Sequence, residues 1–216
     1  MIPLTPELIL QAYAIGVFPM AESRDDPELF FIDPNNRGIL PLDKFHVPRS
    51  LAKTLRKGGF DIRCNTAFRE VLAGCAESTE NRHDTWINDE IVRLFLEFHR
   101  MGLAHSIETW RDDRLVGGLY GLAMGGTFFG ESMFSRATDA SKVALVDLVV
   151  RLTLGGFTLL DTQFVTSHLT RFGAIEIPRE AYKRLLAEAL KVPAVFPTGS
   201  MREHYSAFLQ SITQTS

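Results

Sequence analysis

The sequence predicts an α+β protein with a mixed, mainly antiparallel sheet and a small N-terminal subdomain. The hydrophobic period changes from roughly 3.6 residues to 2 at position 104, and three strand patterns then follow one another. After them, helix and strand patterns alternate, so that the elements read β-β-β-α-β-α-β. The 216 residues are enough for one large domain and one small subdomain.

The N-terminal part of the chain is predicted to be small and irregular. Thr5 can cap a helix with Pro6 at its first position, and Gly16 ends that helix. Residues 21–45 carry prolines and turn-forming residues, which predict loops with short strands. We therefore expect a boundary near Lys44. The expected units are the subdomain, the main domain and a tail, at residues 1–44, 45–197 and 198–216.

Hydrophobic periodicity places the remaining elements in order. Amphipathic patterns predict helices at residues 47–57, 66–76, 88–101, 139–154, 167–172 and 178–190. Alternating or apolar runs predict strands at residues 104–111, 114–124, 127–135, 157–164 and 174–177. Asp139 is the expected cap of the helix that follows the third strand. A short docked helix is expected in the tail, from the helical spacing of Tyr205, Phe208, Leu209 and Ile212.

The composition argues against several functional classes. The chain has 23 Lys and Arg residues and 26 Asp and Glu residues, a net charge of −3, so nucleic-acid contacts would need a local basic patch. Cys64 and Cys75 have neither a metal-ligand spacing nor a disulfide framework, which indicates reduced thiols in a cytoplasmic protein. We expect no signal peptide, membrane span, metal or nucleotide cofactor, because the sequence lacks their motifs.

One local basic patch is present on the predicted helix 47–57. It consists of four cations on one helix face, Arg49, Lys53, Arg56 and Lys57. They form either a solvated surface or a patch that contacts phosphates, and both interpretations stay open. Lys142, at the third position of a later helix, is either tolerated there or part of an anion site with Ser141.

Glu131 is a carboxylate inside an otherwise apolar strand pattern, where an unpaired polar group is costly. Strand alternation assigns two faces, with Phe129, Glu131 and Met133 on one and Phe128, Ser132 and Phe134 on the other. Glu131 is either a buried residue satisfied by an Arg or by backbone amides, or the anionic point of an apolar pocket. In the second case it could bind a cationic group.

Asp161 and Gln163 end a later, buried strand, at a position where sheets often place ligand groups. If the strand is still extended there, both side chains lie on one face. Two nearby carboxylates would allow glycoside hydrolysis, whereas Gln163 favours amide recognition. Trp86, in a polar loop, is either a lid on the core or a platform that stacks on a ligand.

Seven segments of the chain occur together in one known family. They are residues 12–20 (AYAIGVFPM), 85–87 (TWI), 105–110 (HSIETW), 117–121 (GGLYG), 130–135 (GESMFS), 140–142 (ASK) and 161–163 (DTQ). In order and spacing they closely resemble the leucyl/phenylalanyl-tRNA–protein transferases of bacteria, over about residues 5–197. Each motif alone is weak, but seven in order make a specific match.

This resemblance implies a fold and a function. The family moves Leu or Phe from charged tRNA to the N-terminal Arg or Lys of a protein, which marks that protein for N-degron proteolysis, and we expect Met to be accepted too. Its catalytic domain is of the N-acetyltransferase-like type and uses aminoacyl-tRNA instead of acetyl-CoA, without a cofactor. We therefore expect a cytoplasmic, monomeric enzyme that binds aminoacyl-tRNA and protein N-termini and no membrane.

The resemblance also assigns site residues. Asp161 and Gln163 match the catalytic acid–amide pair, and Trp86 matches a ring near the tRNA 3′ end or the peptide. The expected substrate-binding residues are Leu119, Phe128, Glu131, Met133, Leu145, Leu148 and Leu160. For tRNA phosphates we select the basic residues Arg49, Lys53, Arg56, Lys57 and Lys142.

The chain departs from the family at one aromatic position. Many members carry a W-S-P motif where this chain has Ile32-Asp33-Pro34, and Phe30 or Phe31 is the candidate replacement. Two alternative functions remain, an acyl-CoA N-acyltransferase on the same fold and a non-catalytic module that binds peptide N-termini or RNA. The first is disfavoured because the link 134–139 has no glycine for a pyrophosphate loop, and the second would not need the Asp161–Gln163 pair.

Overall fold

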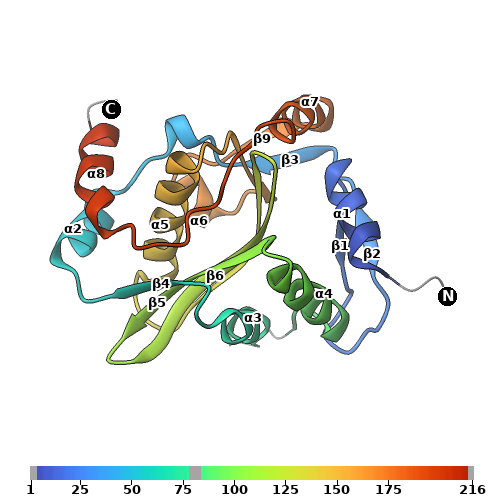
Figure 1. Ribbon diagram of the computed structural model, residues 1–216, viewed down its shortest axis with the longest axis horizontal. Coiled ribbons are helices and arrows are strands. Elements are labelled where there is room, and N and C mark those ends of the chain that lie inside the picture. The colour runs from blue at the N-terminus through green and yellow to red at the C-terminus, as the bar shows by residue number, and fades with distance from the viewer. Residues whose placement is uncertain (1–3, 78–83, 214–216) are drawn as a thin grey trace.

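The computed structural model describes residues 4–77 and 84–213, and its centre is a seven-stranded sheet (Figure 1). The strands are β1 (Phe18–Met20), β2 (Phe30–Ile32), β3 (Asn36–Ile39), β4 (Asp61–Cys64), β5 (Ala104–Arg111), β6 (Arg114–Met124), β7 (Thr127–Ser135), β8 (Leu159–Gln163) and β9 (Ile175–Pro178). The α-helices are α1 (Pro6–Ala14), α2 (Arg49–Lys57), α3 (Phe68–Ala76), α4 (Asp89–Arg100), α5 (Ala140–Leu154), α6 (Ser167–Thr170), α7 (Arg179–Ala189) and α8 (Tyr205–Thr213). Two short 3₁₀ turns, Leu42–Lys44 and Arg202–His204, complete the described elements.

The large sheet is mixed and mainly antiparallel, as the sequence predicts. Its strand order is β4-β5-β6-β7-β8-β3-β9. The meander β5-β6-β7 is antiparallel, and only the β7–β8 pair is parallel. A parallel pair needs a crossover connection, which α5 supplies between these two strands. The α+β class is therefore confirmed, whereas the N-acetyltransferase-like type of the sheet stays a prediction.

Helices cover both faces of the sheet and enclose two apolar cores (Figure 1). On one face, α3 and α4 pack with the N-terminal segment around buried residues such as Phe95 and Phe129. On the other face, α5 packs around residues such as Phe128 and Leu148, and α2 and α8 lie against it. The apolar helix stripes expected from the sequence make these contacts, and burying them is the main stabilising term of the fold.

The N-terminal segment contributes to both sheets. Strands β1 and β2 form a separate antiparallel pair, next to α1. Strand β3 instead lies between β8 and β9 in the large sheet, although it precedes the expected boundary at Lys44. The division at residues 1–44, 45–197 and 198–216 stays a prediction, and its two outer units include ends that lie outside the described residues.

Two local predictions need correction or completion. Asp139 does not cap α5 with its side chain, because its backbone is left-handed at φ 67° and its carboxylate accepts hydrogen bonds from Lys142 Nζ and Thr54 Oγ1 instead. The tail does form a helix, α8, in which Leu209 is buried against α5 and Tyr205 donates a hydrogen bond to Asp147. The side chain of Ile212 lies outside the described part of the chain.

Within the described residues, none of the helices has the length and apolar character needed to span a membrane.

Candidate active site

A cavity of about 500 Å³ opens where β7 and β8 stop pairing. The last paired residues are Phe129 and Asp161, and the cavity is lined by the residues that follow on each strand, 130–133 and 162–164. The other lining residues come from β1, β6, α5, α6 and nearby loops: Phe18, Met20, Trp86, Leu119, Tyr120, Leu145, Leu148, Leu160, Thr166, His168 and Leu169. Parting of two parallel strands therefore creates an opening in the middle of the sheet.

Most of the residues selected from the sequence meet at this cavity. Its lining includes Trp86, Leu119, Glu131, Met133, Leu145, Leu148, Leu160 and Gln163. Phe128 is fully buried elsewhere, where its ring stacks on that of Phe196 at 5.5 Å between centroids. Asp161 is also fully buried and contacts the cavity wall from behind, through the backbone of Gln163.

Glu131 occupies a bulge in β7 that the sequence did not predict. Tyr120 pairs with Ser132 and Gly121 pairs with Gly130, which leaves Glu131 without a partner on β6. One extra residue reverses the alternation beyond it, so the predicted faces are wrong. Phe129 and Phe134 both pack on the α3–α4 side, whereas Phe128 and Met133 both pack on the α5 side.

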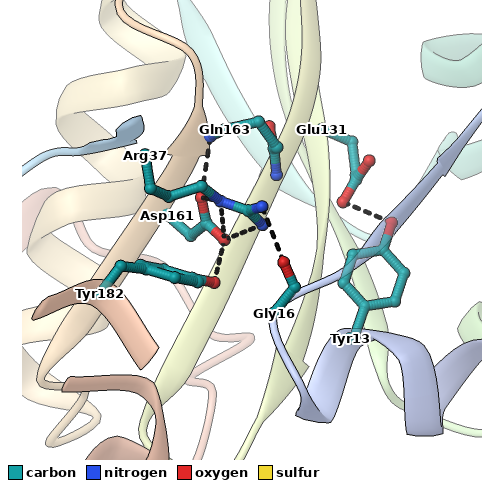
Figure 2. A network of polar contacts seen from close by, with 7 residues as sticks. All are labelled: Tyr13, Gly16, Arg37, Glu131, Asp161, Gln163 and Tyr182. Carbon is teal, nitrogen blue, oxygen red and sulfur yellow. Dashed lines mark hydrogen bonds and ion pairs between the residues drawn. The ribbon is translucent and has the colours of Figure 1, made fainter. Parts of the chain in front are cut away.

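The bulge leaves the Glu131 carboxyl group in the cavity wall, where Tyr13 OH donates a 2.8 Å hydrogen bond to Oε1 (Figure 2). Burial raises the pKa of Glu131 to about 8, and the charge of Asp161 adds to this, while the hydrogen bond from Tyr13 opposes it. Burial and the adjacent Glu131 charge likewise raise the pKa of Tyr13. Among the described residues, no cation forms an ion pair with this carboxyl group.

Asp161, by contrast, has all of its acceptor positions occupied (Figure 2). Arg37 donates from Nη2 at 2.7 Å and from Nε at 3.0 Å, and Tyr182 OH donates at 2.5 Å. The backbone N–H of Gln163 donates to Oδ1 at 2.8 Å. Arg37 and Asp161 are 1% and 0% exposed, so the pair is a fully buried ion pair.

The condition under which the side chains of Asp161 and Gln163 would share one face is not met. The strand is not extended at Gln163, where φ is 54°, and Phe164 N–H donates to the Thr162 carbonyl at 2.6 Å. This is a γ-turn with a left-handed central residue. Asp161 bonds the backbone of Gln163 rather than its side-chain amide, whose Nε2 is buried without a partner among the described residues.

Three members of the hydrogen-bond network around Asp161 and Glu131 were missed from the sequence. Tyr13 lies inside a quoted motif but reads as an apolar position of α1, and Tyr182 likewise reads as part of the stripe of α7. Arg37 follows Asn35-Asn36, so its surroundings predict an exposed turn. Its partner Asp161 is 124 positions away, and no local signal indicates that contact.

The basic residues selected for tRNA lie outside the cavity. Arg49, Lys53, Arg56 and Lys57 are exposed on α2, and none of them makes an ion pair with a described residue. Lys142, at the start of α5, is paired with Asp139 at 2.7 Å. Because Thr54 of α2 also bonds Asp139, the two groups of cations belong to adjoining surfaces.

His168 lies at the cavity, where burial and then the charges of Lys142 and Arg171 lower its pKa.

Comparison with known proteins agrees with the motifs. The family model described as leucyl/phenylalanyl-tRNA protein transferase matches residues 39–187, and the one described as the N-terminal domain of that transferase matches residues 3–35. The chain belongs to this transferase family. The family resemblance found in the motifs is thus confirmed, and so is the prediction that the chain is a transferase enzyme.

Relatives in the family cover nearly the whole chain. The leucyl/phenylalanyl-tRNA–protein transferase of Paramagnetospirillum magneticum is 63% identical over 194 residues, which cover 90% of this chain and 93% of the relative. The protein of that name from Phenylobacterium zucineum is 58% identical over 188 residues, covering 87% and 85%. The boundary between the two family matches falls at residues 35–39, at strand β3.

Solved structures give only weak similarities. One is described as the structure of L-PGS from Bacillus licheniformis, with 12% identity and a TM-score of 0.41, over 76% of this chain and 55% of that chain. Another is the C-terminal domain of a putative lysylphosphatidylglycerol synthetase from Agrobacterium fabrum, with 11% identity and a TM-score of 0.43, over 89% and 80%. These scores are too low to define the type of the sheet.

Proposed function

We propose that this protein transfers Leu or Phe, and also Met, from aminoacyl-tRNA to the N-terminal Arg or Lys of acceptor proteins, and so marks them for N-degron proteolysis. The observation that carries this proposal is the cavity, which is apolar at Leu119, Leu145 and Leu148 and polar at Glu131 and Gln163. An aminoacyl side chain fits the apolar part, while the polar part receives the reacting groups. The enzyme would act as a cytoplasmic monomer on an N-acetyltransferase-like sheet.

The reaction forms one bond and breaks another. The α-amine of the acceptor attacks the ester carbonyl carbon of aminoacyl-tRNA, the new C–N bond forms, and the C–O bond to the tRNA ribose breaks. Ester to amide is downhill, so no nucleoside triphosphate is needed at this step. The amine must be neutral to attack, and its ordinary pKa is about 8. The leaving ribose oxygen takes up the proton that the amine nitrogen loses when the C–N bond forms.

The polar residues would divide this work between them. The Gln163 side-chain carbonyl would accept an N–H of the attacking amine and hold it in line, with Asp161 orienting Gln163. Asp161 is a poor proton acceptor because Arg37, Tyr182 and Gln163 already occupy its oxygens. Glu131 would instead hold a cationic group of a substrate: burial raises its pKa to about 8, and a positive charge bound beside it would favour the ionised carboxylate.

Pocket shape would determine which amino acids are accepted. Side chains that are unbranched at Cβ, such as Leu, Phe and Met, suit the apolar slot between Met133, Leu145 and Leu160. A missing methylene costs only about 1–3 kcal/mol, so Val and Ile are best excluded by shape. Trp86 lies at the cavity and would stack on the tRNA 3′ end or the acceptor peptide.

Strand register favours Phe30 over Phe31 as the replacement for the aromatic residue that the chain lacks. Met20 pairs with Phe30 and Pro19 pairs with Phe31 across the β1–β2 ribbon. Directly paired residues lie on the same face of a ribbon. Because Met20 lines the cavity, the face that carries Phe30 is the one turned toward it. Phe30 is 44% exposed and so is available to stack on a ligand.

A transfer assay tests the function directly. Leu-, Phe-, Met- and Arg-tRNA are each incubated with peptides that begin with Arg, Lys, Asp or Glu, and the product peptides are identified by mass. Transfer of Leu, Phe and Met to the Arg and Lys peptides is expected. Loss of transfer when the apolar slot is closed by Leu148→Trp would link the activity to this cavity. A purified, folded protein that transfers none of these residues would contradict the proposal.

A salt titration tests the tRNA surface. Each phosphate contact that is lost should flatten the plot of log affinity against log salt by about one unit. The double variant Lys53→Ala with Arg56→Ala should therefore bind charged tRNA more weakly and with a shallower slope. Arg100→Ala with Lys191→Ala is a matched control, because it removes the same charge from exposed positions on α4 and just after α7. Equal slopes for the two double variants would remove α2 from the tRNA surface.

A further inference from the structure

The side chain of Arg37 joins three separate parts of the molecule behind the cavity (Figure 2). Nη1 donates to the carbonyl of Gly16 at 2.9 Å, in the N-terminal segment, while Nε and Nη2 donate to Asp161 at the end of β8. The guanidinium lies 4.4 Å from the ring centre of Phe18 and 4.6 Å from that of Tyr182. All three of its nitrogen atoms are therefore in use, and the planar fork also contacts two aromatic rings.

Asp161, which Arg37 holds in place, determines the backbone conformation of Gln163. Its Oδ1 accepts the N–H of Gln163, which lies at the centre of the γ-turn with φ at 54°. A non-glycine residue in the left-handed region is strained and persists only where its surroundings hold it. Room for the turn comes from Gly38 of β3, because a Cβ there would lie 2.6 Å from the backbone of Phe164. Without the bond to Asp161, Gln163 would relax and turn its side chain away from the cavity.

We infer that Arg37 is a positioning residue for the transfer reaction, acting through Asp161 to hold the γ-turn that presents Gln163 to the substrates. This inference rests on the proposed function. Arg37 is 1% exposed and is not among the described residues that line the cavity, so it does not touch a substrate itself. Through Gly16 and Phe18 the same side chain makes the geometry of Gln163 depend on the docking of the N-terminal segment.

A cycle of variants separates action through Asp161 from an independent role. Arg37→Met, Asp161→Asn and the double variant are compared for kcat and for both KM values. When Asp161 is intact, Arg37→Met should lower kcat by about 100-fold, since small misplacements of reacting groups cost this much. When Asp161→Asn is already present, Arg37→Met should change kcat by less than about threefold, because the two residues act as one unit. KM for tRNA and peptide should change little.

A second variant and a direct measurement distinguish the loss of Gln163 positioning from misfolding of the protein. Arg37→Lys keeps the charge but cannot bond Gly16 and both Asp161 oxygens together, so a folded protein with lowered kcat is expected. Hydrogen exchange of the Gln163 amide should speed up in both Arg37 variants. The amide of Leu40, which donates to the Leu160 carbonyl on the neighbouring strand, should stay protected. Unchanged exchange at Gln163 would contradict the role assigned to Asp161.

Arg179→Met is the matched control. Arg179 also ties the N-terminal segment to α7, through Asp33 and Asn35, but does not contact Asp161. Its replacement should leave kcat and Gln163 exchange unchanged. Equal losses of kcat for Arg37→Met with and without Asp161→Asn, or a rise only in KM for tRNA, would overturn the inference. If the wild-type protein transfers no amino acid at all, the proposed function fails instead, and hydrogen exchange still tests the positioning of Gln163.

Discussion

Two clusters in this molecule, each built on a fully buried ion pair, have the same three residue types but different consequences. The Asp161 cluster consists of Arg37, Asp161 and Tyr182, and the Asp147 cluster consists of Asp147, Arg151 and Tyr205. In each, an Arg and an Asp that are at most 1% exposed form an ion pair, and a Tyr hydroxyl donates to the same carboxylate.

The clusters differ in where their members come from and what else they bind. Asp147 and Arg151 are one turn apart on α5, and Nη1 of Arg151 donates to the carbonyls of Pro197 and Gly199. The Asp147 cluster thus fastens the C-terminal segment to α5. The Asp161 cluster joins residues that are 124 positions apart, and its further hydrogen bonds are to the Gly16 carbonyl and to the Gln163 backbone at the cavity. The same chemistry anchors a tail in one place and shapes a candidate active site in the other.

The largest expected contrast is in turnover after one carboxylate is removed. Asp161→Ala and Asp147→Ala should each cost about 3–5 kcal/mol in the free energy of unfolding, because each leaves a buried Arg without its partner. Asp161→Ala should also lower kcat by about 100-fold or more, since Gln163 loses its support. Asp147→Ala should leave kcat of the folded fraction within a few-fold of wild type. Denaturant titration and the transfer assay measure the two quantities, and near-normal turnover of Asp161→Ala would erase the distinction.

Replacing each ion pair with apolar residues sharpens the comparison. Replacing both partners of a buried ion pair with apolar residues often leaves the free energy of unfolding unchanged or raises it by about 1–4 kcal/mol. Asp147→Leu with Arg151→Met should therefore keep both stability and transfer activity. Arg37→Met with Asp161→Leu should keep much of the stability but have little activity. If activity followed stability in both double variants, the Asp161 cluster would have only the structural role of its counterpart.

The tyrosines should show a smaller effect of the same kind. Tyr182→Phe and Tyr205→Phe each remove one hydrogen bond to a carboxylate, worth about 1.5–3 kcal/mol. Only Tyr182→Phe should also reduce kcat, by several-fold, because Asp161 then has one contact fewer. Melting curves and initial rates are the measurements. A decrease in kcat for Tyr205→Phe as large as that for Tyr182→Phe would show that the tail matters to the reaction.

The smallest effect concerns pH and the Glu131 carboxyl group in the cavity wall. Burial raises the pKa of Glu131 to about 8, so between its ordinary pKa and 8 the folded protein holds a proton that the unfolded chain releases. The contribution of Glu131 to stability is therefore lost as pH rises from its ordinary pKa to about 8, above which the group is ionised in both states. Relative to Glu131→Gln, the wild-type Tm should fall between pH 5 and pH 9. The exposed control Glu28→Gln should track the wild type, and a constant gap between wild type and Glu131→Gln would contradict the raised pKa.

Local patterns allowed much of the fold to be predicted. Hydrophobic periodicity identified the meander and the tail helix α8, whereas α5, which is buried on nearly all sides, was delimited by Asp139 and by Gly155-Gly156. The i, i+4 spacing of Asp147 and Arg151 also places those residues on one helix face, although their role was not predicted. The candidate cavity residues came from the family resemblance, and eight of them line the cavity.

The sequence by itself therefore determined the order and type of most elements, the family, and the chemical character of the cavity. Only the tertiary structure decided the bulge at Glu131, the γ-turn at Gln163 and the burial of Arg37. The physical reason is distance along the chain. A bulge depends on the register of a neighbouring strand. Arg37 is buried by Phe18, Asp161 and Tyr182, which come from three separate segments of the chain. Periodicity reports which face a residue prefers, but not which distant residue lies across from it.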